Sequence, residues 1–177
     1  MKITEIEVLH LQIETAKPIQ DATIPTPTSE KGTRAQIFVN IYTDEGITGL
    51  GISYPSPGIQ EVIEKSLTPI LIGQDPTNIE KIWNDMYWQV RGFGRKGVAF
   101  CAISAVDIGL WDLKAKSVGL PLYKLLGPYQ ESVPVYGSGG WTNFTETELI
   151  EEMSDYVSDG IPRVKMKVGK DFGQSER

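Results

Sequence analysis

The feature that most constrains the fold is a strand, a helix and a second strand within ~35 residues of the C-terminal part. Residues 133–136 predict a short strand that ends in the glycine-rich segment 137–140. Thr145 and Glu148 have the spacing of a capping box at the start of a helix. A second strand then covers residues 164–168. Because a helix joins the two strands, we expect them to be parallel with a right-handed crossover.

The second strand carries two lysines in alternation, in the run Val-Lys-Met-Lys-Val-Gly at 164–169. Side chains alternate between faces of a strand, so Lys165 and Lys167 share one face while Val164, Met166 and Val168 share the other. On a partly desolvated surface two ammonium groups lower each other's pKa, as a lysine acting as a base near neutral pH requires. Alternating lysines are also ordinary on a strand face that contacts water.

The first part of the chain predicts a three-stranded antiparallel meander. Residues 2–15 predict its first strand, and alternating residues 35–42 and 47–54 predict a hairpin around the turn at 43–46. Gly49 and Gly51 in the last strand indicate a bulge or a close approach of another backbone. Two proline-rich stretches are expected to be irregular loops, at 17–32 and 54–58.

Helices follow this meander. A first helix at 59–67 should end or kink at Pro69, and Asp75 and Pro76 have the residue types of a helix start. The strongest helical pattern covers 98–118, and a short turn follows at 122–126. The fold class expected is therefore α+β. We expect a boundary between two domains, residues 1–128 and 129–177.

Composition excludes several classes of function. The net charge of −6 provides no Lys/Arg excess to neutralise phosphates, so we expect no nucleic-acid partner. Cys101 is the only cysteine and His10 the only histidine, and His10 has no recognisable acidic partner, which favours a structural role. No apolar run approaches the ~20 residues of a membrane span. A soluble, cytoplasmic protein that binds small molecules is expected.

Residues 102–116, with the sequence AISAVDIGLWDLKAK, and the following Pro121–Gly127 resemble the signature helix of the mandelate racemase and muconate lactonizing branch of the enolase superfamily. One departure is Gly109, where that signature usually has alanine. The resemblance covers essentially the whole chain. It implies an α+β capping domain followed by the first two strands of a (β/α)8 barrel, whose lysines would point into the barrel near its catalytic rim.

The resemblance also implies a mechanism. Family members bind a carboxylate substrate to Mg²⁺, a base removes the proton alpha to the carboxylate, and the metal stabilises the enediolate. Lys167 matches the second lysine of the family's K-x-K motif, the base. Lys165 matches the first, which helps to hold the base neutral. Tyr54 and Ser138 would contact substrate, and the loops 17–32 and 53–58 would close over the barrel mouth.

The family's metal ligands lie on later barrel strands, so we expect the Mg²⁺ ligands beyond Arg177 and none within this sequence. The 177 residues alone are then expected to lack stable Mg²⁺ binding and catalysis, and to associate through uncovered apolar faces. For the full-length protein we expect a homo-oligomer.

The reaction implied first is a sugar-acid dehydration on a small carboxylate substrate. A racemase or epimerase and a cycloisomerase share the same first step and stay open. A different hypothesis is a non-catalytic binding or assembly module, in which the two lysines would face solvent.

Overall fold

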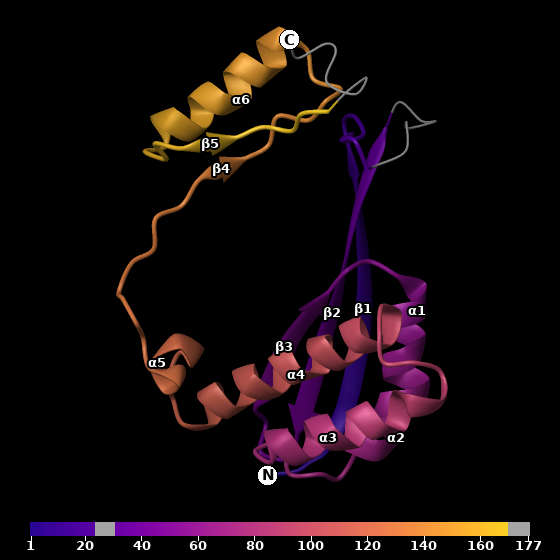
Figure 1. The fold of residues 1–177 in the computed structure, drawn as a ribbon. Coiled ribbons are helices and arrows are strands. Elements are labelled where there is room, and N and C mark those ends of the chain that lie inside the picture. The colour runs from indigo at the N-terminus through magenta and orange to yellow at the C-terminus, as the bar shows by residue number, and fades with distance from the viewer. Residues whose placement is uncertain (24–30, 170–177) are drawn as a thin grey trace. The chain divides into compact units, whose positions relative to one another are not determined.

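The computed structural model describes residues 1–23 and 31–169 (Figure 1). The elements, in chain order, are β1 (Ile3–Thr15), β2 (Gly32–Thr43), β3 (Thr48–Ser53), α1 (Pro57–Glu61), the π-helical turn η1 (Val62–Leu67), α2 (Thr68–Leu71), α3 (Ile79–Gln89), the 3₁₀ turn η2 (Val90–Gly92), α4 (Val98–Ser117), α5 (Leu122–Leu126), β4 (Gly137–Ser138), α6 (Glu146–Ser158) and β5 (Val164–Lys165). No helix in the described ranges combines the length and apolarity that a bilayer crossing requires.

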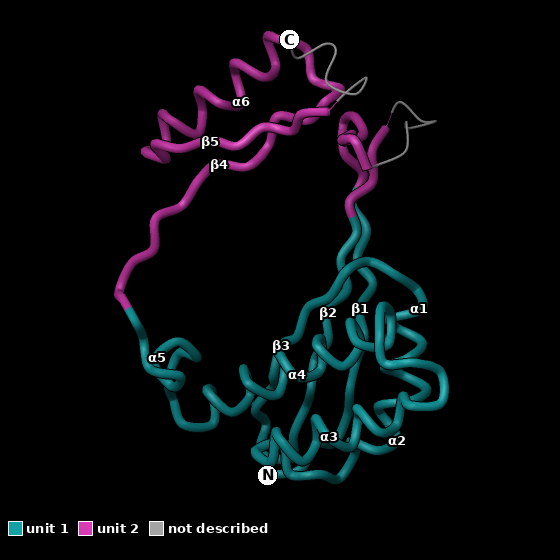
Figure 2. The backbone as a smooth tube through the Cα atoms, in the orientation of Figure 1, with its two compact units in different colours: residues 1–13, 35–129 teal, residues 14–34, 130–177 magenta. Residues whose placement is uncertain are grey.

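The chain forms two compact units, coloured separately in Figure 2. The first contains residues 1–13 and 35–129, and the second contains residues 14–34 and 130–177. The stretch 14–34 therefore belongs with the C-terminal residues, although the predicted domains place it in residues 1–128. The division into a capping domain and a barrel domain stays a prediction.

The first unit is built on a three-stranded antiparallel sheet in the order β1-β2-β3, which confirms the predicted meander. β2 and β3 pair antiparallel from Ile37 opposite Ser53 to Tyr42 opposite Thr48. In the turn between them the Thr43 hydroxyl donates to the carbonyl of Ile47 at 2.8 Å, and Gly46 adopts φ 75°. A positive φ suits glycine, so the turn residues determine the register of the hairpin.

Helix α4 lies directly against β3, and glycines make this approach possible. A Cβ atom at Gly51 would lie 1.9 Å from the carbonyl oxygen of Ala105, and one at Gly49 would lie 2.1 Å from that of Gly109. Asp112 of α4 also accepts the backbone N–H of Leu50 at 2.8 Å. The predicted close backbone approach at Gly49 and Gly51 is thus confirmed.

The core of the first unit lies between the sheet and the helices, which cover one face of it in Figure 1. Its largest fully buried side chains come from β1, β2 and every helical segment from α1 to α4 except η2; they are Ile3, Ile37, Ile41, Ile59, Ile63, Leu67, Leu71, Ile82, Met86, Ile103, Leu110 and Leu113. Burial of such side chains is the main favourable contribution to folding.

One helix end and one helix start differ from the prediction. Of the two outcomes predicted at Pro69, an end or a kink, the end is wrong: the helical path passes through the π-helical turn η1 and continues to Leu71, with Pro69 in the first turn of α2, where no N–H is needed. Helix α3 begins after Asn78, later than predicted. Asp75 instead accepts the backbone N–H and the hydroxyl of Thr77, at 3.0 and 2.7 Å, and forms a turn before the helix.

In the second unit β4 and β5 pair in parallel, as predicted. The capping box at Thr145 and Glu148 is also confirmed. The predicted strand at 133–136 is wrong, because the paired residues are Gly137 and Ser138. Val133, Val135 and Tyr136 are 67, 54 and 56% exposed, and a strand forms where a neighbour completes its hydrogen bonds rather than where residue types favour it.

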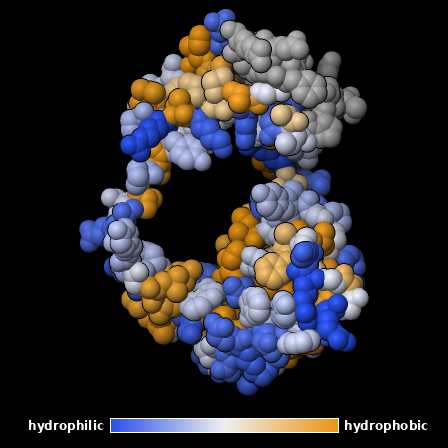
Figure 3. Space-filling model, viewed as in Figure 1, coloured by the Kyte–Doolittle hydropathy of each residue, from blue (hydrophilic) through white to orange (hydrophobic). Residues whose placement is uncertain are grey.

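Apolar side chains remain at the surface of both units, as the orange atoms in Figure 3 show. On the second unit they include the alternating residues of the lysine strand, since Val164, Met166 and Val168 are 44, 45 and 62% exposed.

Candidate active site

The two lysines lie at the end of a short parallel ladder. Ser138 is opposite Lys165, the Gly137 N–H donates to the carbonyl of Arg163 at 2.9 Å, and the Gly139 N–H donates to that of Lys165 at 3.0 Å. The Lys167 N–H then donates to the Gly140 carbonyl at 2.9 Å. The ladder therefore fixes the backbone of both lysines to the segment that follows β4.

Helix α6 covers the opposite face of this ladder. A Cβ atom at Gly137 would lie 2.2 Å from the Tyr156 ring, and one at Gly139 would lie 2.2 Å from the Glu152 carboxylate. Gly137 and Gly139 thus face α6. Because neighbouring residues alternate between faces, Ser138 and its partner Lys165 lie on the side away from the helix.

Each lysine has an aromatic neighbour. The Nζ of Lys165 lies 5.8 Å from the centroid of the Tyr136 ring, and the Nζ of Lys167 lies 5.2 Å from that of Trp141. Such contacts favour a cation over the ring face. Sequence reasoning missed Tyr136 and Trp141. The signal for them was their position on either side of the glycine-rich segment, but only the tertiary structure shows that they contact the lysines.

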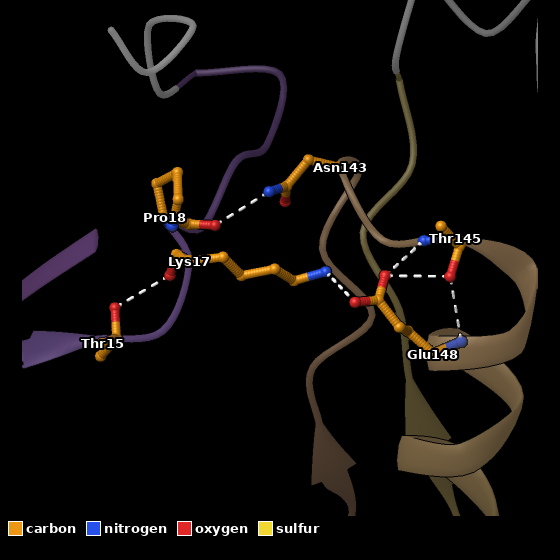
Figure 4. Close-up of polar contacts among 6 residues, drawn as sticks. All are labelled: Thr15, Lys17, Pro18, Asn143, Thr145 and Glu148. Atoms are coloured by element: carbon orange, nitrogen blue, oxygen red, sulfur yellow. Dashed lines mark hydrogen bonds and ion pairs between the residues drawn. The ribbon is translucent and has the colours of Figure 1, made fainter. Parts of the chain in front are cut away.

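Residues 17–23, the described start of the predicted loop 17–32, attach to the same end of the ladder (Figure 4). The Lys17 ammonium contacts the Glu148 carboxylate at 2.5 Å, and the Asn143 side-chain amide donates to the carbonyl of Pro18 at 2.8 Å. The N–H of Thr142 donates to the carbonyl of Gln20 at 2.9 Å. The part of the predicted loop at 24–30 lies outside the described residues.

Glu148 connects this loop to helix α6. Its second carboxylate oxygen accepts the Thr145 backbone N–H at 2.8 Å and the Thr145 hydroxyl at 3.0 Å (Figure 4). The hydrogen bond from Lys17, followed by those from Thr145, lowers the pKa of Glu148 to about 2. Glu148 therefore stays charged across the physiological range, as the ion pair to Lys17 requires.

The other predicted substrate contact, Tyr54, belongs to the first unit. Its side chain is 78% exposed at the edge of a cavity of about 570 Å³, which is also lined by Gln36, Ile52, Ser53, Phe100, Cys101 and Ser104. The Gln36 side chain donates to the carbonyl of Ser53 within this cavity lining. Tyr54 and the lysines lie in different units, so a shared site for them stays a prediction.

The described residues do not fit a magnesium site. Across 1–23 and 31–169, no three Asp, Glu, His or Cys side chains converge as metal ligands. Two carboxylates of α6 on this side already have partners: Glu148 contacts Lys17, and Glu152 accepts the backbone N–H of Gly140 at 2.6 Å. This part of the chain therefore offers lysines but no set of hard oxygen ligands.

Comparison with known proteins identifies the family of the first part of the chain. Residues 4–127 match the model of the mandelate racemase / muconate lactonizing enzyme N-terminal domain. The chain belongs to this family of the enolase superfamily. The resemblance of the signature helix is thus confirmed.

Two curated relatives of this family member are a cycloisomerase and a dehydratase. The 3,6-anhydro-alpha-L-galactonate cycloisomerase of Streptomyces coelicolor is 40% identical over 138 residues, 76% of this chain and 38% of the relative. The L-talarate/galactarate dehydratase of Salmonella typhimurium is 38% identical over 162 residues, 88% of this chain and 40% of the relative. The chain spans about two fifths of the length of these relatives.

Solved structures show the same relationship. A mandelate racemase/muconate lactonizing enzyme-like protein from Rubrobacter xylanophilus superposes with a TM-score of 0.87 at 36% identity, over 97% of this chain and 46% of that protein. The Salmonella typhimurium dehydratase, liganded with Mg and L-lyxarohydroxamate, gives a TM-score of 0.84 at 33% identity, over 95% of this chain and 44% of that protein.

Proposed function

We propose that this chain supplies the capping domain and the first two barrel strands of a Mg²⁺-dependent enzyme that removes the proton alpha to a carboxylate, and that the enzyme is a sugar-acid dehydratase. In this proposal β4 and β5 begin a (β/α)8 barrel, with α6 outside and the lysine face inside. Support comes from family membership and from curated relatives that include dehydratases of L-talarate/galactarate and of arabinonate.

The observation that carries the proposal is the face on which the lysines lie. Lys165 lies opposite Ser138, on the side of the β4–β5 pair away from α6. In a barrel that side is the interior, and the carboxyl ends of the strands form the catalytic rim. A lysine on the face of β5 that α6 covers could not reach a substrate.

Lys167 is the proposed base. Its neutral amine would accept the alpha proton and become an ammonium, while the electron pair of the C–H bond passes to the carboxylate as the enediolate forms. Lys165, one strand repeat away on the same face, would help to keep Lys167 neutral through charge repulsion and would contact the carboxylate. Ser138 lies beside Lys165 and would contact substrate, and Tyr54 is proposed as a second contact.

Magnesium belongs to the proposal for the whole protein. Solved relatives contain Mg, among them an L-talarate dehydratase from Polaromonas complexed with Mg and L-glucarate. Its ligands are proposed to lie beyond Arg177.

A cycloisomerase is the second candidate, because curated relatives of comparable identity include the cycloisomerases of 3,6-anhydro-alpha-L-galactonate and of D-galactarolactone. The two activities separate by product mass. A dehydratase product is lighter than its substrate by one water, whereas a cycloisomerase product has the same mass. Mass spectrometry of reactions with a panel of sugar acids and lactones, in the presence of Mg²⁺, decides between them.

The role of Lys167 is tested by exchange of the substrate's alpha proton in D₂O, measured by NMR with the whole enzyme. Lys167→Ala should lower the exchange rate by at least about a hundredfold, since general base catalysis typically contributes that much or more. Lys96→Ala, which removes an exposed lysine of the first unit, is the matched control and should leave the rate unchanged. Near-wild-type exchange in Lys167→Ala would exclude Lys167 as the base.

A further inference from the structure

The β4–β5 ladder is irregular where it reaches Lys167. From the Gly137–Arg163 bond to the Gly139–Lys165 bond, each strand advances by two residues. A regular parallel ladder would next pair the Lys167 N–H with the carbonyl of Gly139. The Lys167 N–H donates instead to Gly140, one residue further along. An extra residue of this kind redirects the backbone, and such bulges are common beside active sites.

Gly140 is built into this shift. It has φ 60°, and a Cβ atom there would lie 2.6 Å from the Cβ of Met166 and 3.0 Å from the Cδ1 of Leu149. Both the backbone conformation and the space around it require glycine. Gly140 is also buried, so its backbone N–H needs a partner within the protein.

Glu152 of α6 provides that partner. Its Oε2 accepts the Gly140 N–H at 2.6 Å, and its carboxylate contacts the position that a Cβ of Gly139 would occupy. The carboxylate thus lies on the α6 side of the ladder, while the lysine side chains lie on the other side. The Glu152 carboxylate is thus separated from both lysine side chains. It holds Gly140, whose carbonyl accepts the Lys167 N–H.

We infer that Glu152 is a positioning residue for Lys167: it fixes Gly140, and Gly140 in turn fixes the backbone from which the lysine projects. The consequence for catalysis rests on the proposed function of Lys167 as the base. Because a carboxylate is a strong acceptor for a backbone N–H, its loss should loosen Gly140 and Lys167 together. A small displacement of a reacting group slows the chemical step more than it weakens substrate binding.

The structural part is tested by amide hydrogen exchange in the whole enzyme, measured at single-residue resolution by mass spectrometry. Glu152→Leu should accelerate exchange of the Gly140 and Lys167 amides by at least about tenfold, while the Gly137 amide stays within about twofold. Glu152→Gln keeps an acceptor oxygen at the same reach and should retain most of the protection. Glu151→Leu, which removes an exposed carboxylate one residue away, is the matched control.

Unchanged exchange at Lys167 in Glu152→Leu would overturn the inference, and so would equal acceleration at Gly137, which would indicate general unfolding. If Glu152→Leu does not fold, Glu152→Asp serves instead. It keeps the charge but withdraws it by one methylene, and it should accelerate the same two amides.

The catalytic part is tested in the whole enzyme by steady-state kinetics. Glu152→Leu should lower kcat by about tenfold or more with KM within about twofold, and Glu152→Gln should restore most of kcat. A raised KM with unchanged kcat would contradict a positioning role. Should Lys167→Ala leave alpha-proton exchange intact, the proposed function fails, whereas the amide exchange experiment still judges whether Glu152 holds this backbone.

Discussion

At the scale of single residues, three glycines determine how closely α4 approaches the sheet. Gly49 and Gly51 on β3 face the backbone of α4, and Gly109 on α4 faces the side chain of Ile41 at 2.8 Å from where its Cβ would be. The alanine that the family signature usually has at position 109 would therefore press on Ile41. Because this Ile41 atom is the end of a flexible side chain, a shift of Ile41 would accommodate the alanine.

Gly51→Ala is expected to destabilise the first unit by about 1–3 kcal/mol or more, because its Cβ would lie 1.9 Å from a backbone oxygen that cannot move without shifting α4. Urea denaturation followed by circular dichroism measures this. Gly92→Ala is the control, since no atom lies within 4 Å of the added Cβ. Equal stability of the two variants would show that the helix relaxes at little cost.

At the scale of elements, one carboxylate joins a loop to a helix. Glu148 completes the capping box of α6 with one oxygen and contacts Lys17 with the other. The capping box is readable from the sequence because its two residues are three apart. The contact with Lys17 is not, because 131 residues separate the partners. Local spacing therefore predicted the start of the helix but not the attachment of the loop.

This connection gives a pH dependence with a definite sign. The pKa of Glu148 is lowered from its ordinary 4.5 to about 2, so its contribution to stability is fully present above pH 4.5 and is lost as the pH falls toward 2. NMR titration of the Glu148 side chain and of the Thr145 amide should show this transition near pH 2. Lys17→Met should move the midpoint upward, whereas Lys31→Met, which removes a lysine paired with the exposed Glu14, should not. A Glu148 midpoint near 4.5 in the unmodified chain would contradict the ion pair.

At the scale of the whole molecule, the described residues of the second unit form little core. Its α6 contains no fully buried side chain, in contrast to α4, and the apolar residues of the lysine strand are about half exposed. In a barrel such residues pack under the surrounding helices. An apolar face that α6 covers only in part favours association.

We therefore expect the 177-residue chain to self-associate at micromolar concentration, measured by sedimentation velocity. Val168→Glu should reduce the association, because it places a charge on the apolar face of the lysine strand, where Val168 is 62% exposed. Val118→Glu, at a valine that is 55% exposed in the first unit, should have little effect. A clean monomer with a cooperative melt would count against this expectation.

The sequence by itself determined most of the elements and the family. Period-2 and helical patterns located the meander, the long helix 98–118 and the capping box, because these depend on neighbours within a few residues. The signature helix and the lysine pair identified the superfamily. The strand at 133–136 and the helix start at Asp75 were predicted wrongly, because residue type competed there with the partners available in the fold.

Only the tertiary structure decided which groups meet. The lysine pattern is the same for a solvent-facing strand and for a barrel strand, and it was the packing of α6 against Gly137 and Gly139 that assigned the lysines to the opposite face. The contacts of Lys167 with Trp141, of Lys17 with Glu148 and of Glu152 with Gly140 follow from the same packing. The physical reason is that hydrogen bonds and ion pairs depend on distances in space, which local sequence spacing does not specify.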